Sequence, residues 1–435
     1  MAASSKTDSR LEVTFTSELM QRQRSSDRGA EKSASSAAGK SKVGELIALV
    51  TVPLVLVLGN SMIVPILPTL RRELDISAFQ SSLVITAFSI IAGIVIPMAG
   101  YFSDRFSRKA VLIPALIIYG VAGILSGLAA IWHSYWLLMG ARALQGIGAA
   151  GTTPIAMALV GDLYKDGMES KALGLIEASN GSGKVISPIL GSLLALIVWY
   201  AAFFAFPVFC ILAIVFLLLF VKEPKREGEP TRLKPYVHRI GEIFAKDGRW
   251  LIVSFWAGAA SMFILFGVLF FLSNILEDKP YAIDGVRKGF VLTIPLFGMV
   301  LAAYITGSVI RKNGVLIRWL MNIGLGLMVA SLCLAIWLTQ NLYVFVGLLT
   351  VSSISTGLLL PCLTTMITGV VEKAERGMIT SLYSSLRFIG VAFGPPLFGW
   401  MMNISQRTVF ISVTALSAFT LALVLFLVKP SKQVK

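Results

Sequence analysis

The sequence predicts an all-α membrane protein whose chain crosses the bilayer twelve times, as two halves of six spans each. Composition is the first reason. Of 435 residues, 56% are hydrophobic and only 14% are charged, whereas about 25% of the residues in a soluble domain are charged. The second reason is that apolar runs long enough to cross about 30 Å of hydrocarbon recur after residue 45. This composition excludes a soluble enzyme and a largely disordered chain.

The predicted elements follow in order along the chain. The spans begin near residues 46, 80, 110, 135, 171 and 199 in the first half, and near 250, 289, 315, 342, 378 and 408 in the second. These runs predict the following segments: a disordered cytoplasmic tail over 1–45, a six-helix bundle over 46–221, a cytoplasmic loop over 222–249, a second six-helix bundle over 250–428, and a cytoplasmic tail over 429–435.

The central loop contains an amphipathic pattern. Apolar residues at positions 236, 237, 240, 243 and 244 predict a short helix that lies on the membrane surface. Residues 1–45 have no apolar segment, so we do not expect a cleaved signal peptide there. Most of the 38 Lys and Arg residues fall in segments that lie inside the cell when the N-terminus does. This bias predicts that both termini are cytoplasmic.

The two halves contain an internal repeat. Gly100 and Pro154 recur as Gly307 and Pro361 at the same spacing. Such a repeat predicts two halves of parallel topology, related by an axis along the membrane normal. A substrate site at the interface of two such halves is typical of transporters that work by alternating access.

Charged residues inside the predicted spans mark the candidate site, because an isolated charge in a membrane usually faces a cavity or a partner. Glu177 and Lys184 are seven residues apart, so they lie on one helix face about 10 Å apart along the axis. Glu177 is the only acid placed deep in a span and is therefore the predicted proton carrier. The alternative is a structural charge pair that joins helices.

Other polar residues of the spans complete the predicted cleft. They are Asn60 in span 1, Arg142 and Gln145 in span 4, and Arg387 in span 11. Two alternatives remain open at this point. Arg142 could instead extend to the membrane interface, and Asn60 could instead bond its own helix.

The loop after span 2 resembles the loop signature of the major facilitator superfamily, G-x-L-a-D-r-x-G-r-k. It reads Gly100-Tyr-Phe-Ser-Asp104-Arg105-Phe-Ser107-Arg108-Lys, with Ser107 in the place of a Gly. The resemblance implies a conformational latch in which the acid sits against the start of span 11, near residue 377, and holds the halves closed on the cytoplasmic side. A carboxylate is stabilised at a helix N-terminus. The alternative is an ordinary basic loop.

Spans 4 and 5 carry two further resemblances to that family. Span 4 contains R-A-L-Q-G-I-G from Arg142, which is similar to the family's R-x-x-q-G-x-g and implies that Arg142 tunes a nearby proton site. Span 5 resembles the antiporter signature G-x-x-x-G-P-x-x-G through Gly183, Ser187, Pro188 and Gly191, with Ser187 replacing a Gly. This signature marks the drug-exporting and proton-antiporter branches, and Pro188 predicts a helix bend.

The resemblance implies a proton-coupled exporter of small amphipathic molecules, similar to the twelve-span drug:proton antiporters of bacterial multidrug efflux. In such a mechanism, protonation of Glu177 and substrate occupancy compete for one cleft, and the Asp104 latch sets which side is open. We expect a monomer in the cell membrane. The expected partners are a small-molecule substrate, protons and membrane lipids, with no nucleic acid, no cofactor and no metal.

Two alternative functions remain, each with its own reason. The deep charges are three bases and one acid, which favours export of an organic anion, a metal chelate or a lipid. An intramembrane enzyme or a receptor that has lost transport is the remote alternative. An enzyme needs a nucleophile with a base or a set of metal ligands, but His133 and His238 fall in loops and the three Cys are far apart. A receptor needs a soluble output domain, and the sequence has no stretch long enough for one.

Overall fold

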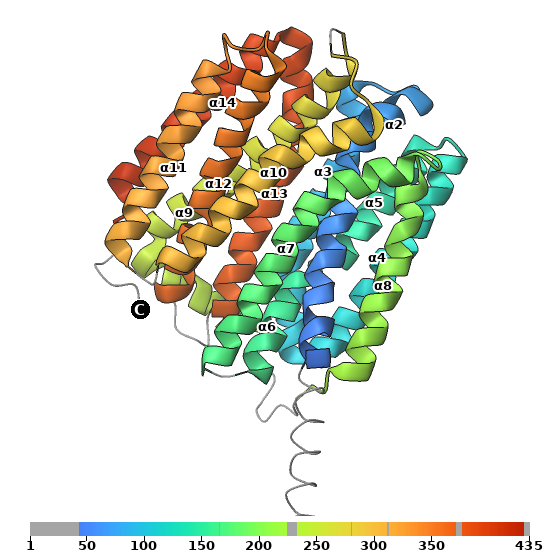
Figure 1. The fold of residues 1–435 in the computed structure, drawn as a ribbon. Helices are drawn as coiled ribbons and strands as arrows, with labels where there is room; N and C mark the ends of the chain where they lie inside the picture. Colours follow the sequence, from blue (N-terminus) through green and yellow to red (C-terminus); the bar gives the residue numbers. More distant parts are fainter. Residues whose placement is uncertain are drawn as a thin grey trace, which may run out of the picture.

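The computed structural model describes residues 43–164, 166–223, 233–279, 281–310, 313–370 and 376–429, and the elements over these ranges are helices (Figure 1). The first half contains the helical residues 43–61, then η1 (Val64–Ile66), α2 (Leu67–Glu73), α3 (Ala78–Arg105), α4 (Arg108–Ile131), α5 (Tyr135–Ala150), α6 (Thr153–Leu163), α7 (Asp166–Ala195) and α8 (Ala201–Phe220). The second half contains α9 (Leu233–Glu277), α10 (Gly285–Ile310), α11 (Gly314–Leu334), α12 (Leu342–Val370), α13 (Arg376–Ile404) and α14 (Gln406–Leu427).

Prolines and a glycine interrupt two of the predicted spans. The first span ends its α-helix at residue 61 and continues as η1 and α2, where Pro65 and Pro68 each remove a backbone donor. The fourth span divides into α5 and α6 at Gly151, with Pro154 in the first turn of α6. A proline is tolerated in a first turn because the N–H it lacks has no partner there.

The helix expected in the central loop is not a separate element. Residues 236–244 belong to α9, which runs 45 residues from Leu233 to Glu277 without a break. Gly241 and Gly248 interrupt neither the helix nor its continuation into the seventh span. The amphipathic pattern therefore predicted the helix but not its continuity with the span.

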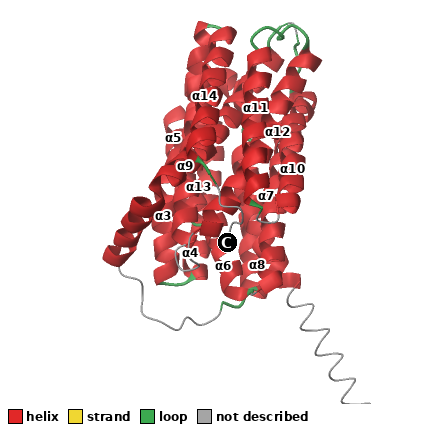
Figure 2. Ribbon diagram, turned by 90° about the vertical axis from the view of Figure 1, so that its left-hand side faces the viewer, coloured by secondary structure: helices red, strands yellow, loops and turns green. Residues whose placement is uncertain are grey.

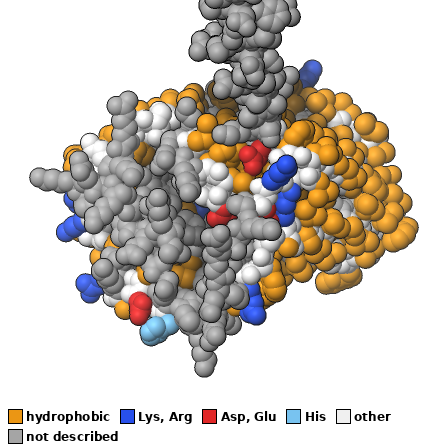
Figure 3. Space-filling view, turned by 90° about the horizontal axis from the view of Figure 1, so that it is seen from below, with side chains coloured by type: hydrophobic (Ala, Val, Ile, Leu, Met, Phe, Trp, Pro, Cys, Tyr) orange, Lys and Arg blue, Asp and Glu red, His pale blue; other side chains and the backbone are white. Residues whose placement is uncertain are grey.

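Ten of the described segments are long and apolar enough to cross a membrane. The two predicted spans outside this set are α7 and α13, which are 30 and 29 residues long and carry charged residues. The flanks expose large apolar side chains, for example Trp136 (81%), Tyr343 (87%) and Phe426 (75%). The view from below shows hydrophobic side chains over the flank and charged ones near the middle of this end (Figure 3). The molecule therefore has the surface of a multi-pass membrane protein.

Two long helix pairs join the halves. The first is α3 with α13, where Thr86 donates to the carbonyl of Ala392 (2.6 Å) and Ser385 donates to that of Gly93. The second is α7 with α10, where Thr293 donates to the carbonyl of Val185 (3.1 Å). The helices run side by side through the molecule (Figure 2), so α7 and α13 both lie at the interface between the halves.

Candidate functional site

The position of α7 determines where Glu177 and Lys184 point. Gly183 and Gly191 turn one side of α7 toward the first helix, where a methyl group on Gly191 would lie 2.3 Å from the carbonyl oxygen of Met62. Gly181 turns another side toward Val300 of α10. With 3.6 residues per turn, Glu177 and Lys184 lie on the face between these two contacts. They therefore lie on the side of α7 where the halves meet, with Glu177 exposed and Lys184 half-buried.

The opposite side of α7 confirms this orientation. Leu175, Ile186 and Leu193 lie there and are 45%, 50% and 45% exposed, which is the pattern of a lipid-facing surface. The two charged residues are thus on the side of α7 that does not face lipid.

Arg387 occupies the corresponding position on α13. One side of α13 contacts α3 through Ser385, and another contacts α9, where a methyl group on Gly390 would lie 2.1 Å from the carbonyl oxygen of Ala259. Phe393 and Trp400 are 46% and 56% exposed on the lipid side. Arg387 lies away from that lipid side, toward the interior, and its guanidinium carbon is 5.5 Å from the centre of the Tyr383 ring.

Electrostatic interactions connect these groups across the two halves. Lys184 interacts with Arg387 across the interface and with Glu177 on its own helix. Tyr383 interacts with Arg387 and Glu177. Electrostatic interactions thus link Glu177, Lys184 and Arg387 into one cluster, and their role as a shared site stays a prediction. Tyr383 was missed, although it lies four residues before Arg387 and so on the same helix face.

The cluster lacks ion pairs. Within the described ranges, neither Glu177, Lys184 nor Arg387 has an oppositely charged group within 4.0 Å. The Nε atom of Arg387 is buried and has no hydrogen-bond acceptor in the same ranges. A buried donor without a partner costs about 1–3 kcal/mol, so this cation is available to a ligand.

A second predicted group forms a separate network inside the first half. Arg142 is fully buried and donates to the carbonyl of Val84 (3.0 Å), to Oε1 of Gln145 (2.5 Å) and to Oδ1 of Asn60 (3.4 Å). Its guanidinium carbon lies 4.6 Å from the centre of the Phe88 ring. Arg142 therefore does not extend to the membrane interface, and Asn60 bonds another helix rather than only its own.

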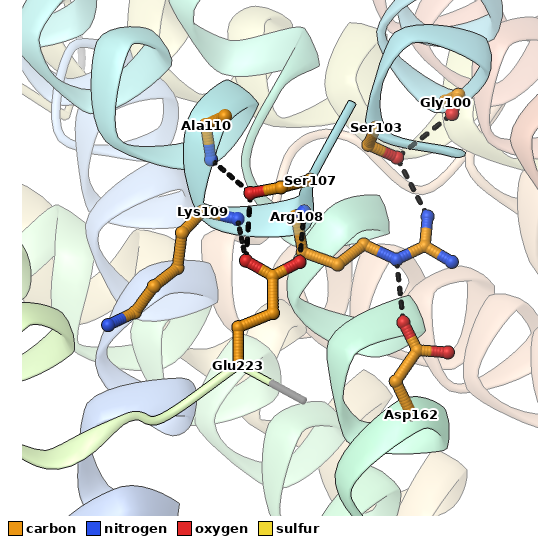
Figure 4. A network of polar contacts seen from close by, with 8 residues as sticks. All are labelled: Gly100, Ser103, Ser107, Arg108, Lys109, Ala110, Asp162 and Glu223. Carbon is orange, nitrogen blue, oxygen red and sulfur yellow. Dashed lines mark hydrogen bonds and ion pairs between the residues drawn. The ribbon is translucent and has the colours of Figure 1, made fainter. Parts of the chain in front are cut away.

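The loop between α3 and α4 is tied to its own half (Figure 4). Arg108 pairs with Asp162 at the end of α6 (Nε to Oδ2 2.9 Å) and donates to Ser103 (2.8 Å). Arg105 donates to the hydroxyl of Tyr101 (3.2 Å). These contacts join α3, α4 and α6 into one unit at this end. Asp162 was missed because only the fold brings it to Arg108.

The substitution of Ser107 for the expected glycine has a structural use. Its hydroxyl accepts from the backbone N–H of Ala110 (3.0 Å), which caps the start of α4. Glu223, which follows α8, accepts from the Ser107 hydroxyl (2.8 Å) and from the backbone N–H of Arg108 (2.6 Å). A carboxylate at this position is stabilised by the helix dipole. Glu223 was missed, since nothing in its local sequence indicates this partner.

The latch itself stays a prediction. The side chain of Asp104 lies outside the described part of the molecule, and so do the side chains at the start of α13. What is described is the approach of Gly100 to α13, where a methyl group would lie 3.1 Å from the hydroxyl oxygen of Ser381. The expected bend at Pro188 also stays a prediction; the hydroxyl of Ser187 bonds the carbonyl of Gly183 within an unbroken α7.

An ion-pair cluster joins the halves at the opposite end of the molecule. Glu277 of α9 pairs with Arg72 of α2, in the first half, and with Lys288 of α10. Nearby, Ser273 of α9 donates to the carbonyl of Val64 in η1 (2.9 Å). The sequence indicated Arg72 and Lys288 only as bases of outer loops, so this contact between the halves was not predicted.

Comparison with known proteins gives a family. A sequence model described as Major Facilitator Superfamily matches residues 49–314 and 278–435. The chain is 42% identical to the Bacillibactin exporter of Bacillus subtilis (strain 168) over 89% of this chain and 97% of that protein. It is 27% identical to Multidrug resistance protein 1 of the same organism, over 84% of this chain and 92% of that protein.

Solved structures show the same fold. The crystal structure of the human organic anion transporter MFSD10 (TETRAN) superposes with a TM-score of 0.69 at 17% identity, over 87% of this chain and 98% of that one. The inward-facing, occupied structure of a bacterial homologue of the human lysosomal transporter Spinster gives 0.66 at 18% identity, over 87% and 95%.

Proposed function

This chain belongs to the major facilitator superfamily, and from that premise we propose that it exports a metal-chelating small molecule of the siderophore class across the cell membrane. The family consists of membrane transporters, so the protein is a transporter and not an enzyme. The observation that carries the proposal is the 42% identity to a bacillibactin exporter over 97% of its length. The multidrug relative covers a similar share of the chain at only 27%.

Transport into inside-out vesicles tests this substrate class. We expect vesicles that contain the protein to accumulate bacillibactin, and vesicles without it not to. Tetracycline serves as the drug probe, because a tetracycline resistance protein is among the relatives at 25% identity. Accumulation of tetracycline without bacillibactin would return the protein to the multidrug class that the motifs indicate.

We propose twelve spans with both termini in the cytoplasm, in a monomer. The lengths of α7 and α13 and their packing against α10 and α3 support the two spans beyond the ten apolar ones. In a cysteine-free variant, we expect an impermeant thiol reagent to label Arg407→Cys from outside whole cells. Arg249→Cys should react only after the cells are opened, and the reverse pattern would refute the orientation.

We propose that protons couple to export at Glu177. Its electrostatic interactions with Lys184 and Tyr383, on the face of α7 that lies away from lipid, support this role. In inside-out vesicles acidified within, a transported compound should release protons in the wild type and not in Glu177→Gln. Glu242→Gln is the matched control, because Glu242 is an exposed acid on α9. If Glu177→Gln still releases protons, another group carries them.

We propose that the loop after α3 acts as the cytoplasmic latch of alternating access, through Gly100, Asp104, Arg105 and Arg108. The contact of Gly100 with α13 and the Arg108–Asp162 pair support it. Asp104→Asn should slow transport strongly while leaving binding of bacillibactin intact. Equal transport by Asp104→Asn and the wild type would mean that this segment is an ordinary basic loop and not a latch.

A further inference from the structure

We propose that Lys184 and Arg387 form a two-cation clamp that binds an anionic oxygen group of the transported molecule between the two halves. The inference rests on the proposed function for its probe and goes beyond it by naming the residues and the charge of the group that they bind. The two cations come from α7 and α13, one in each half, and they lie within electrostatic range of each other.

The buried cations of the described ranges show why these two half-buried cations are different. Arg108 pairs with Asp162, Lys288 pairs with Glu277, and Arg142 donates to three oxygens. Each of them is compensated inside the protein. Lys184 and Arg387 have no such partner, and a buried Nε of Arg387 has no acceptor in the described part of the molecule. An anionic oxygen of a ligand would supply the missing hydrogen-bond acceptor and counter-charge.

Two like charges held near each other also repel, which disfavours a closed interface without a ligand. An anionic group between them changes repulsion into two attractions. Because one cation belongs to each half, the same group would draw the halves together. Binding and closure are therefore linked through a single ionic contact.

The geometry of Arg387 suits a planar oxygen ligand. Its guanidinium group lies beside the Tyr383 ring, 5.5 Å from the ring centre, which limits its orientations. A guanidinium group binds carboxylate-like pairs of oxygens through two parallel hydrogen bonds, whereas a lysine acts as a point charge. The pair thus combines one directional and one non-directional cation.

Glu177 is the internal competitor of such a ligand. It interacts with Lys184 but is not within ion-pair distance of it. With Glu177 ionised, one acid faces two bases, and the three groups carry a net charge of +1. Glu177 is thus the one negative charge that a bound anion would face, and its replacement by a neutral residue should strengthen binding of an anion.

Calorimetric titration of the full-length purified protein in lipid nanodiscs tests the clamp. The probes are bacillibactin, salicylate, and salicylamide as the neutral counterpart of salicylate. We expect Lys184→Gln and Arg387→Gln each to weaken binding of the two anionic probes about tenfold or more, since a charged hydrogen bond contributes about 1.5–3 kcal/mol. Salicylamide binding should change little in either variant.

Charge-preserving variants and a surface control separate binding from folding. Lys184→Arg should retain most of the affinity for salicylate. Arg387→Lys should retain only part of it, because the charge stays and the paired hydrogen bonds are lost. Arg407→Gln, at an exposed base, should retain all of it. Equal losses for salicylate and salicylamide, or no binding of any anionic probe to the wild type, would overturn the clamp.

The outcomes distinguish the two proposals. If bacillibactin is exported and its binding is unchanged in both variants, the clamp is wrong and the function stands. If salicylate binding depends on both cations while bacillibactin neither binds nor is exported, the clamp stands and the siderophore class is wrong.

Discussion

Arg142, Lys184 and Arg387 are all cations within the membrane-spanning helices, but they differ in the partners that surround them. Arg142 lies within one half and donates to oxygens of three residues, all neutral. Lys184 and Arg387 lie between halves and have no ion-pair partner in the described ranges. The difference teaches that depth alone does not indicate function. A compensated buried charge fixes the structure, and an uncompensated one between the halves is available for a ligand.

The largest expected effect tests the structural half of this comparison. Arg142→Gln removes the donor to Val84, Gln145 and Asn60 and leaves their oxygens buried. We expect a loss of about 2–5 kcal/mol of stability, measured as a lower unfolding temperature in nanodiscs. Lys184→Gln is the control and should barely lower that temperature, because the lysine has no ion pair or hydrogen bond to lose among the described residues. Equal destabilisation by both variants would contradict the distinction between a structural Arg142 and a ligand-binding Lys184.

The next effect tests how α7 holds Lys184 at the interface. A methyl group on Gly191 would lie 2.3 Å from the Met62 carbonyl oxygen, so Gly191→Ala must push α7 away from the first helix. We expect a loss of about 1–3 kcal/mol of stability, with weaker salicylate binding. Gly174→Ala, on the same helix with no neighbour within 4 Å, is the matched control and should be neutral or stabilising.

A third measurement sharpens the charge argument through its sign. Glu177→Gln removes the one negative charge of the cluster, so at constant pH salicylate should bind a few-fold more tightly to this variant than to the wild type. A lipophilic cation such as tetraphenylphosphonium should bind a few-fold more weakly. Glu242→Gln, at an exposed acid of α9, is the control and should change neither affinity. A change of the same sign for both probes would show that the charge of Glu177 does not act on the binding site.

The smallest effect concerns the outer ion pairs. Arg72 is 61% exposed in its side chain, so its pair with Glu277 is a surface pair that contributes at most about 1 kcal/mol. Arg72→Gln should barely change the unfolding temperature, while Glu277→Gln should lower it more because it leaves Lys288 buried without a counter-charge. Equal effects would mean that Lys288 finds another acceptor.

The sequence predicted the helices and singled out Glu177, Lys184 and Arg387, because apolar length and rare charges within spans are local signals. The partners of those residues were harder. Tyr383 was accessible from its spacing to Arg387, whereas Asp162, Glu223 and Glu277 reach their partners only through the packing of distant helices. The continuity of α9 was also missed, since a pattern on one helix face does not indicate whether the next span bends away.

The scarcity of acid in the cluster has a consequence for the energy source of export. A cell interior is electrically negative, and moving one elementary charge across 100 mV is worth about 2.3 kcal/mol. One anionic charge bound to a cluster of net charge +1 makes the loaded cluster neutral, so the voltage has little effect on the outward step. The empty carrier returns with its net charge of +1, and the negative interior draws this charge inward. Export of an anion by this protein should therefore be electrogenic. When potassium and valinomycin fix the voltage across the vesicle membrane at constant pH, the measured export rate should depend on that voltage.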